Sequence, residues 1–293
     1  MRVGVIDVGS NTIRLLAADV GPYGLEVVHE HRVWALLGVD VAKTGEISPE
    51  RLEAAGEAVA QLAGVARRAG CVRVETLVAS PGRQASNAGA LVRALERVSG
   101  APVRVLGREE EALLGYQGAV AAAGPLDGAV AVCDVGGGST QLAIGLADRA
   151  PSWLRSFDIG SLRLTADALE GDPPGKSAVK LARDVVRREL EGLVVPLPGT
   201  ALAVGGSARA LRRMVGRTLG EDELREAVSI LRKSPSRAVS KTFDVPSARA
   251  RTLLAGALIL TEVQRCLMEP LRVVAKGLRE GAVLELAARR AAA

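Results

Sequence analysis

The sequence predicts an α/β protein of two duplicated halves, each a mixed sheet with flanking helices, with the functional site in the cleft between them. A strand, a glycine-containing turn and a second strand open the chain over residues 2–18, and the same pattern returns over residues 129–144. Alternating strand and helix patterns follow each hairpin, a succession typical of a mixed sheet with helices on its faces. The length of 293 residues corresponds to about two domains of ~150 residues.

The elements of the first half follow from hydrophobic periodicity and from helix start signals. A third strand is expected at 24–34. A helix is expected at 49–69, because Ser48 suits the N-cap and Pro49 suits the first helical position. The remaining patterns indicate a strand at 72–79, a helix at 87–99, a strand at 102–106 and a helix at 108–123.

The second hairpin repeats the first residue by residue. Asp134 follows Asp7 by 127 positions, and the same spacing pairs Gly136 with Gly9. Six such identities fall within one strand–turn–strand frame, which indicates an internal duplication.

The predicted domains are residues 1–124 and 125–293, separated by the glycine- and proline-containing segment 124–128. The last helix, about 278–293, is a candidate to pack back onto the first domain. The other elements expected in the second domain are a strand near 151–159, helices near 160–169 and 177–194, a strand at 200–204, a helix at 207–216, helices near 221–233 and 247–268, and a strand at 271–275.

Composition argues against several functional classes. Aromatic residues make up only 2% of the chain, which is too few for base-stacking nucleic-acid modules, so we expect no nucleic-acid partner. Three widely spaced cysteines indicate neither a disulfide framework nor a zinc site. No apolar stretch is long enough to span a bilayer, and a strand pattern in place of a signal peptide opens the chain. We therefore expect a cytoplasmic location and no membrane partner.

Basic residues are concentrated in the last third of the chain. Residues 201–293 hold 17 Lys and Arg against 9 Asp and Glu, whereas residues 1–200 hold 21 against 24. Two interpretations remain open: these side chains steer a polyanion, or they are solvated helix faces. Ten of these 17 residues are the candidates considered: Arg209, Arg212, Arg213, Arg217, Arg232, Lys233, Arg237, Lys241, Arg249 and Arg251.

Glycine-rich loops at strand ends predict phosphate contacts. The Gly136–Gly137–Gly138–Ser139 turn has more glycines than an ordinary hairpin needs, and successive backbone N–H groups can form an anion-binding nest. The Gly205–Gly206–Ser207 segment follows a strand and opens a helix, so its amides would face an anion; a plain strand-to-helix turn is the alternative.

Carboxylates beside such loops need a cation to approach phosphate. Asp7 and Asp134 each end a strand next to a glycine turn, and Mg²⁺ takes one or two carboxylates together with phosphate oxygens. Arg83, in the polar turn 80–87, could hold a phosphate oxygen through its fork of donors. The acidic run 109–111 opens a helix, and acidic side chains at that end interact favourably with the helix dipole.

Seven ordered motifs resemble the exopolyphosphatase/guanosine pentaphosphate phosphohydrolase (Ppx/GppA) family in its short two-domain form. The matching segments are 6–16, 80–87, 110–116, 134–140, 160–165, 205–208 and 277–281. The resemblance covers nearly the whole chain and implies the actin-like ATPase (ribonuclease H-like) fold. Gln84 stands where the family usually has Asp, and Leu113 where it has Arg.

The resemblance also implies roles for individual residues. Glu111 is implied as the residue that activates the attacking water and as a metal contact, and Asp134 as a magnesium contact. The remaining implied phosphate or metal contacts are Asp7, Ser10, Asn11, Arg83, Gly136, Gly137, Gly138, Ser139, Gly205 and Gly206.

The expected activity is magnesium-dependent hydrolysis of the terminal phosphate of inorganic polyphosphate, with the 5′-phosphate of guanosine pentaphosphate as the alternative substrate. Closure about a hinge near 124–128 would exclude water from the cleft. Two alternative functions exist on the same fold: a sugar or acetate-type kinase, and a non-catalytic nucleotide or alarmone sensor. Whether the chain forms a homodimer is left open.

Overall fold

The computed structural model describes residues 1–22 and 24–291. The first half contains β1 (Arg2–Val8), β2 (Thr12–Gly21), β3 (Gly24–Trp34), α1 (Leu37–Thr44), α2 (Pro49–Arg68), β4 (Arg73–Val78), α3 (Pro81–Gln84), α4 (Ala88–Ser99), β5 (Val103–Val105) and α5 (Arg108–Ala123). The second half contains β6 (Ala129–Val135), β7 (Thr140–Leu146), β8 (Trp153–Phe157), α6 (Ser161–Ala168), α7 (Lys176–Glu189), β9 (Thr200–Val204), α8 (Gly205–Val215), β10 (Thr218–Leu219), α9 (Glu221–Leu231), α10 (Ser236–Phe243), α11 (Ser247–Ala250), α12 (Leu253–Leu267), β11 (Leu271–Val273) and α13 (Leu278–Ala291).

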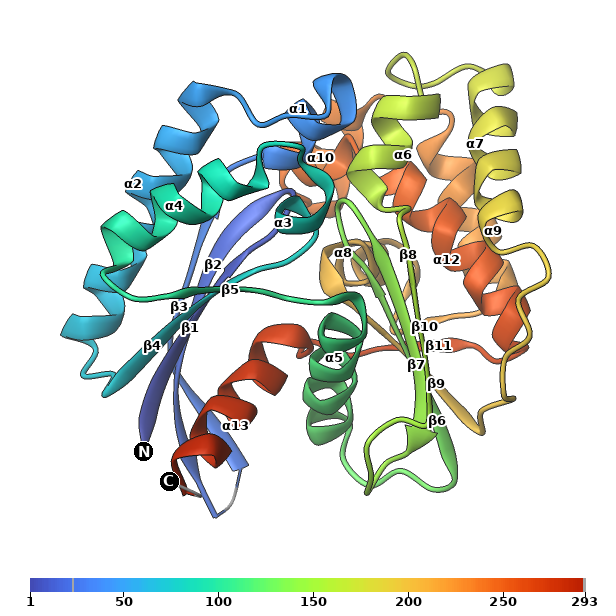
Figure 1. Cartoon of the computed structure of the whole chain (residues 1–293). Coiled ribbons are helices and arrows are strands. Elements are labelled where there is room, and N and C mark those ends of the chain that lie inside the picture. The colour runs from blue at the N-terminus through green and yellow to red at the C-terminus, as the bar shows by residue number, and fades with distance from the viewer. Residues whose placement is uncertain (23, 292–293) are drawn as a thin grey trace.

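Each half is built on its own mixed sheet, and the two halves lie side by side (Figure 1). The first sheet has the order β3-β2-β1-β4-β5 and the second the order β10-β11-β9-β6-β7-β8. In both, a meander of three antiparallel strands continues into parallel pairs, β1 with β4 and β6 with β9. The predicted class, two mixed sheets with flanking helices, is confirmed.

The two hairpins are equivalent in register as well as in sequence. Asp7 pairs with Arg14 across the first hairpin, and Asp134 pairs with Gln141 across the second. The same turn hydrogen bond closes both: the N–H of Gly9 donates to the carbonyl of Thr12, and the N–H of Gly136 to the carbonyl of Ser139, each at 3.0 Å. This register places the two aspartates at matching strand ends, each beside its glycine turn.

Helix α13 packs on the first half, although it follows the second half in the chain (Figure 1). Its Val283 and Leu286 are buried against Val5 and Leu16 of the β1–β2 hairpin. It also packs closely along α5, which in turn contacts β6, β7 and β8. The helix pair α5 and α13 therefore lies between the two sheets. The division at residues 124–125 stays a prediction, and residues 292–293 of the predicted last helix lie outside the described residues.

The differences from the predicted elements are mostly short helices. Helices α1, α3 and α10 span eight residues or fewer, too few for a clear 3.6-residue period, and they were not predicted. The helix expected at 247–268 is two helices, α11 and α12. Along residues 1–22 and 24–291, no helix is long and apolar enough to cross a membrane.

Candidate active site

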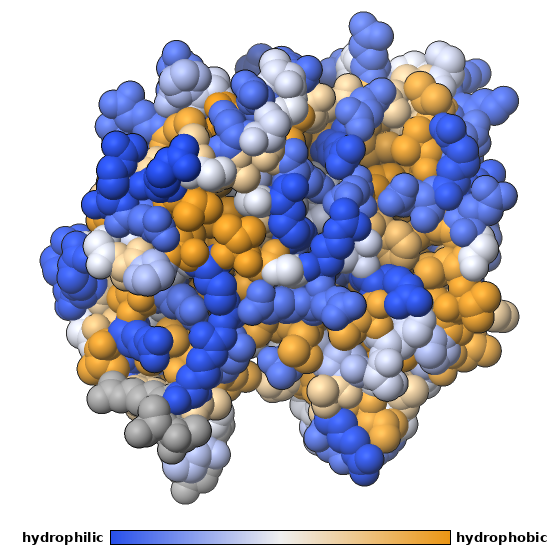
Figure 2. Space-filling view, viewed as in Figure 1, coloured by the Kyte–Doolittle hydropathy of each residue, from blue (hydrophilic) through white to orange (hydrophobic). Residues whose placement is uncertain are grey.

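A cleft of about 860 Å³ lies between the two halves, at the ends of the strands that carry the glycine loops. On the face shown in Figure 2, hydrophilic side chains follow the line where the halves meet, between apolar patches on either side. The predicted site residues that line the cleft are Asp7, Ser10, Asn11, Glu111, Asp134, Gly136, Gly137, Ser139, Gly205 and Gly206.

The loops of the two hairpins meet at close range. A β-carbon at Gly137 would come within 2.8 Å of Asn11 Nδ2. A β-carbon at Gly138 would come within 2.6 Å of Ser10 Oγ and 2.8 Å of Ser80 Oγ. Glycine is therefore required where the second loop enters the first half, because any larger residue would push the halves apart.

The second loop is held from behind by the start of α6. The N–H groups of Ser161 and Leu162 donate to the carbonyls of Gly136 and Gly137, both at 2.9 Å, and Ser161 Oγ donates to Gly136 at 3.1 Å. These bonds hold the carbonyls of Gly136 and Gly137 against α6. A carbonyl oxygen turned into the cleft would instead repel an anion. The arrangement suits the predicted phosphate contact.

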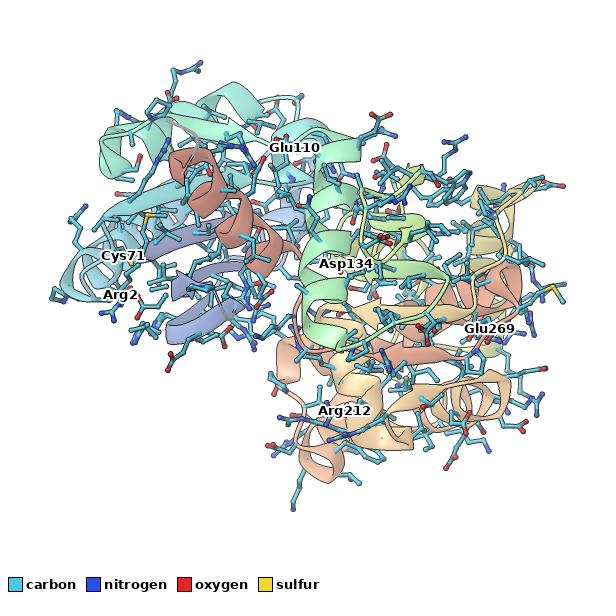
Figure 3. The ribbon with its side chains drawn as sticks, turned by 90° about the horizontal axis from the view of Figure 1, so that it is seen from below. Arg2, Cys71, Glu110, Asp134, Arg212 and Glu269 are labelled. Carbon is cyan, nitrogen blue, oxygen red and sulfur yellow. The ribbon has the colours of Figure 1, made fainter. Side chains whose placement is uncertain are left out.

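Asp134 lies where the halves meet, near the middle of the molecule (Figure 3). Its Oδ1 is only 2.5 Å from where a β-carbon of Gly205 would stand, and Gly205 has a φ of +90°, so both space and backbone call for glycine there. Burial raises the pKa of Asp134, while the nearby Arg209 and Arg14 guanidinium groups lower it.

Asp7 is the counterpart of Asp134 on the first half. Burial raises its pKa to about 6, against the lowering effect of Arg279 and Arg14, and the charge of Asp134 raises it further. Both carboxylates line the same cleft. A cation in that space would stabilise both charged forms.

Glu111 enters the same cleft from the first turn of α5 and is 8% exposed. Burial raises the pKa of its carboxyl to about 7, the Arg83 guanidinium lowers it, and Asp134 and Asp7 raise it. A carboxyl titrating near neutral pH inside a cleft can exchange a proton with water at working pH. The position of Glu111 in the cleft and its raised pKa both fit the implied role in activating water.

Three predicted phosphate contacts lie behind the wall of the cleft. Arg83 donates to Glu111 Oε2 at 2.6 Å and to the carbonyl of Leu106 at 2.7 Å. Ser207 is fully buried, and its Oγ accepts from Arg249 at 3.4 Å. Gly138 packs into the first half. Their positions support neighbours that line the cleft, and none of the three lines it.

Several residues that line the cleft are not among the site residues predicted from the motifs. Of the ten candidate basic residues named above, Arg209, Arg212, Arg213 and Arg249 line the cleft and the other six do not. The remaining cationic lining residues are Arg14, Arg32 and Arg279.

Arg14 could have been found from the strand alternation, because it stands opposite Asp7 in the hairpin. Its Nε is buried without a hydrogen-bond partner in the part of the chain that the structure describes. Burial and the like charge of Arg279 lower the pKa of Arg14 to about 9. Such a crowded cationic wall favours a bound polyanion.

The fold defines an α/β protein of two duplicated halves, each with a mixed sheet and flanking helices, and a polar cleft lies between the halves. A family model described as the Ppx/GppA phosphatase family matches residues 16–290. The chain belongs to this family, so the resemblance seen in the motifs is confirmed. Membership also confirms the predicted enzyme class, a hydrolase acting on phosphoanhydrides.

Known relatives match this chain over nearly its full length. Exopolyphosphatase 1 of Mycobacterium leprae is 28% identical over 302 positions, covering 97% of this chain and 89% of the relative. The crystal structure of the Aquifex aeolicus Ppx/GppA family member is 27% identical with a TM-score of 0.83, covering 99% of this chain and 98% of the other. An exopolyphosphatase structure from Cytophaga hutchinsonii, 21% identical with a TM-score of 0.89 over 98% of this chain and 97% of the other, shows the same fold.

Proposed function

We propose that the protein is an exopolyphosphatase, which hydrolyses the terminal phosphoanhydride bond of inorganic polyphosphate and releases orthophosphate. The observation that carries this proposal is the composition of the cleft wall. Three of the five carboxylates that line the cleft in the described part of the chain, Asp7, Asp134 and Glu111, share it with several arginines. Carboxylates suit a metal and a water, and arginines suit the phosphate chain.

In this proposal the glycine loops and the cleft arginines hold the terminal phosphoryl group in place. Glu111 accepts a proton from the attacking water, and the new P–O bond forms in line with the bond to the bridging oxygen. That bridging bond breaks, and the shortened chain leaves with its electron pair. Arg83 keeps the Glu111 carboxylate in one orientation through the 2.6 Å bond.

Magnesium is the cation we propose for Asp7 and Asp134. Among the described residues, no three His, Cys, Asp or Glu side chains stand close enough to hold a metal by themselves. Magnesium does not require such a cage, since it commonly binds one or two carboxylates plus phosphate oxygens and water. When bound, it would neutralise charge on the phosphate oxygens.

The first prediction tests this function directly. The wild-type protein is expected to release orthophosphate from long polyphosphate with magnesium and to lose that activity with excess chelator. Asp134→Asn is expected to lower the rate by at least ~10²-fold, because one metal or phosphate position is lost.

The measurement is phosphate release from long polyphosphate, short polyphosphate, guanosine pentaphosphate and ATP, with and without magnesium. Binding of these compounds without phosphate release would instead identify a sensor. Transfer from ATP to a sugar would identify a kinase. A cytoplasmic location and a homodimer stay predictions.

Guanosine pentaphosphate is the second candidate substrate, and one observation favours it. With only 2% aromatic residues, the sequence offers no evident platform for a guanine base. In the structure Trp34 lines the cleft at the end of β3, and the Arg32 guanidinium stands 5.9 Å from its ring centroid. An indole at the cleft can stack on a purine.

The second prediction separates the two substrates. Trp34→Ala is expected to lower kcat/KM for guanosine pentaphosphate by roughly 5- to 100-fold, with little effect on polyphosphate, because base stacking is worth ~1–3 kcal/mol. Trp153→Ala is the matched control, since Trp153 also lies beside an arginine, at 5.2 Å, but outside the cleft lining. Equal losses on both substrates would show that Trp34 acts only through structure.

A further inference from the structure

Polar side chains join the two halves beside the second glycine loop. Gln84 Nε2, from α3, donates to the carbonyl of Gly138 and to Asp158 Oδ1, each at 3.0 Å. Arg108, from the first turn of α5, donates to Asp158 Oδ2. Both carboxylate oxygens of one second-half residue are therefore held by different elements of the first half.

This polar contact is connected to the proposed catalytic groups through short covalent paths. Gln84 follows Arg83, which holds the Glu111 carboxylate. Arg108 and Glu111 lie three positions apart on α5, so they share one side of the helix. Gly138 belongs to the glycine loop that lines the cleft beside it.

The other links between the halves are of a different kind: the glycine loops meet, α1 packs against α6, and α5 and α13 lie between the sheets. Over the described residues the two sheets share no strand pair. The helices α5 and α13 pack closely between them, lower in the view of Figure 1 than α3. Asp158 and Arg108 are by contrast partly exposed, at 34% and 53% of their side-chain surface. Closely packed contacts and a small, partly exposed polar contact would respond differently to strain, and the polar contact would open first.

We propose that Gln84, Arg108 and Asp158 form a latch that holds the cleft shut and sets the Gly138 loop against Glu111. Gln84 and Arg108 are positioning residues in this proposal, because they act on the loop and on α5 and do not line the cleft. Its effect on turnover rests on the proposed phosphohydrolase function. Its effect on shape does not.

A substitution at Gln84 can replace its hydrogen-bond donor with an acceptor. Gln84→Glu keeps the size of the side chain but replaces the donor group with a carboxylate oxygen, next to Asp158 and the Gly138 carbonyl. The latch should then open, because acceptors would face acceptors. Adding Asp158→Asn supplies a donor to the new carboxylate and should recover part of the closure. Arg225→Met is the control, since Arg225 pairs with Glu221 and Asp222 on α9 at the surface.

The experiment measures shape and turnover on the full chain. Small-angle X-ray scattering should give wild type and Arg225→Met a compact radius of gyration of about 19 Å, and Gln84→Glu a value larger by ~1 Å or more. With polyphosphate, Gln84→Glu should lose kcat/KM by ~10-fold or more, and Arg108→Lys should keep most of it because the charge on Asp158 remains paired.

The outcomes are distinguishable. An unchanged radius for Gln84→Glu, or no recovery when Asp158→Asn is added, would overturn the latch even if the wild-type enzyme is active. If Gln84→Glu has an increased radius and the wild-type protein releases no phosphate, the latch is supported and the hydrolase is rejected. A fall in kcat/KM with an unchanged radius would also reject the latch, since the loss would then arise without opening.

Discussion

Replacing Glu111 by glutamine is expected to reduce the kcat for phosphate release by about 10²- to 10⁴-fold while substrate affinity changes only a few-fold. In the wild type, Arg83 Nη2 donates to Glu111 Oε2 at 2.6 Å. Glutamine keeps an oxygen that can accept this bond, so the wall of the cleft should keep its shape. What disappears is the group that accepts the proton of water. The measurement is steady-state phosphate release together with a binding titration of polyphosphate.

Glu110 provides the control for this prediction. Its carboxylate caps α5 by accepting from the N–H of Gly107 at 3.1 Å, and it does not line the cleft. Glu110→Gln should keep kcat near wild type and change stability only slightly. Near-native turnover by the Glu111 variant would remove Glu111 from the role of base, whatever the Glu110 variant does.

Introducing alanine at Gly118 is expected to destabilise the protein by about 1–3 kcal/mol or more, because two helices touch there through backbone. A β-carbon at Gly118 would lie 1.9 Å from the carbonyl oxygen of Gly277, at the start of α13. Backbone cannot move aside as a flexible side chain can, so α5 and α13 would have to separate. The measurement is the urea midpoint of unfolding at a constant m value.

The same helix supplies a matched control. A β-carbon at Gly115 would meet no atom within 4 Å. Gly115→Ala should therefore be neutral or stabilising by up to ~1 kcal/mol, since alanine favours helix more than glycine does. Equal stability of the two variants would contradict the close packing of α5 on α13. Gly118→Ala should also lower activity, because Arg279 and Glu280 of α13 line the cleft.

The duplication was the part of the fold that sequence could predict most completely. Two hairpins with the same residue types at the same spacing must close the same way, and the Gly9 and Gly136 turn bonds confirm it. The glycine loops and their aspartates were predicted for the same reason, because strand ends fix where such residues lie. The one-turn helix α3 carries no such period, so the direction of Arg83 could not be read from its neighbours.

Gln84 shows a second limit of sequence reasoning. Its amide binds Gly138 and Asp158, and Asp158 stands 74 positions further along the chain. A pattern of residue types around position 84 contains no information about that partner. The cleft arginines posed the same difficulty, since a basic residue on a helix points toward a cleft or toward solvent according to packing that only the folded chain defines.

The position of α13 has a consequence for biosynthesis. The apolar side of β1 and β2 that receives Val283 and Leu286 leaves the ribosome long before the helix that covers it. During translation that surface of the first half is therefore open to water and to chaperones until α13 has been made.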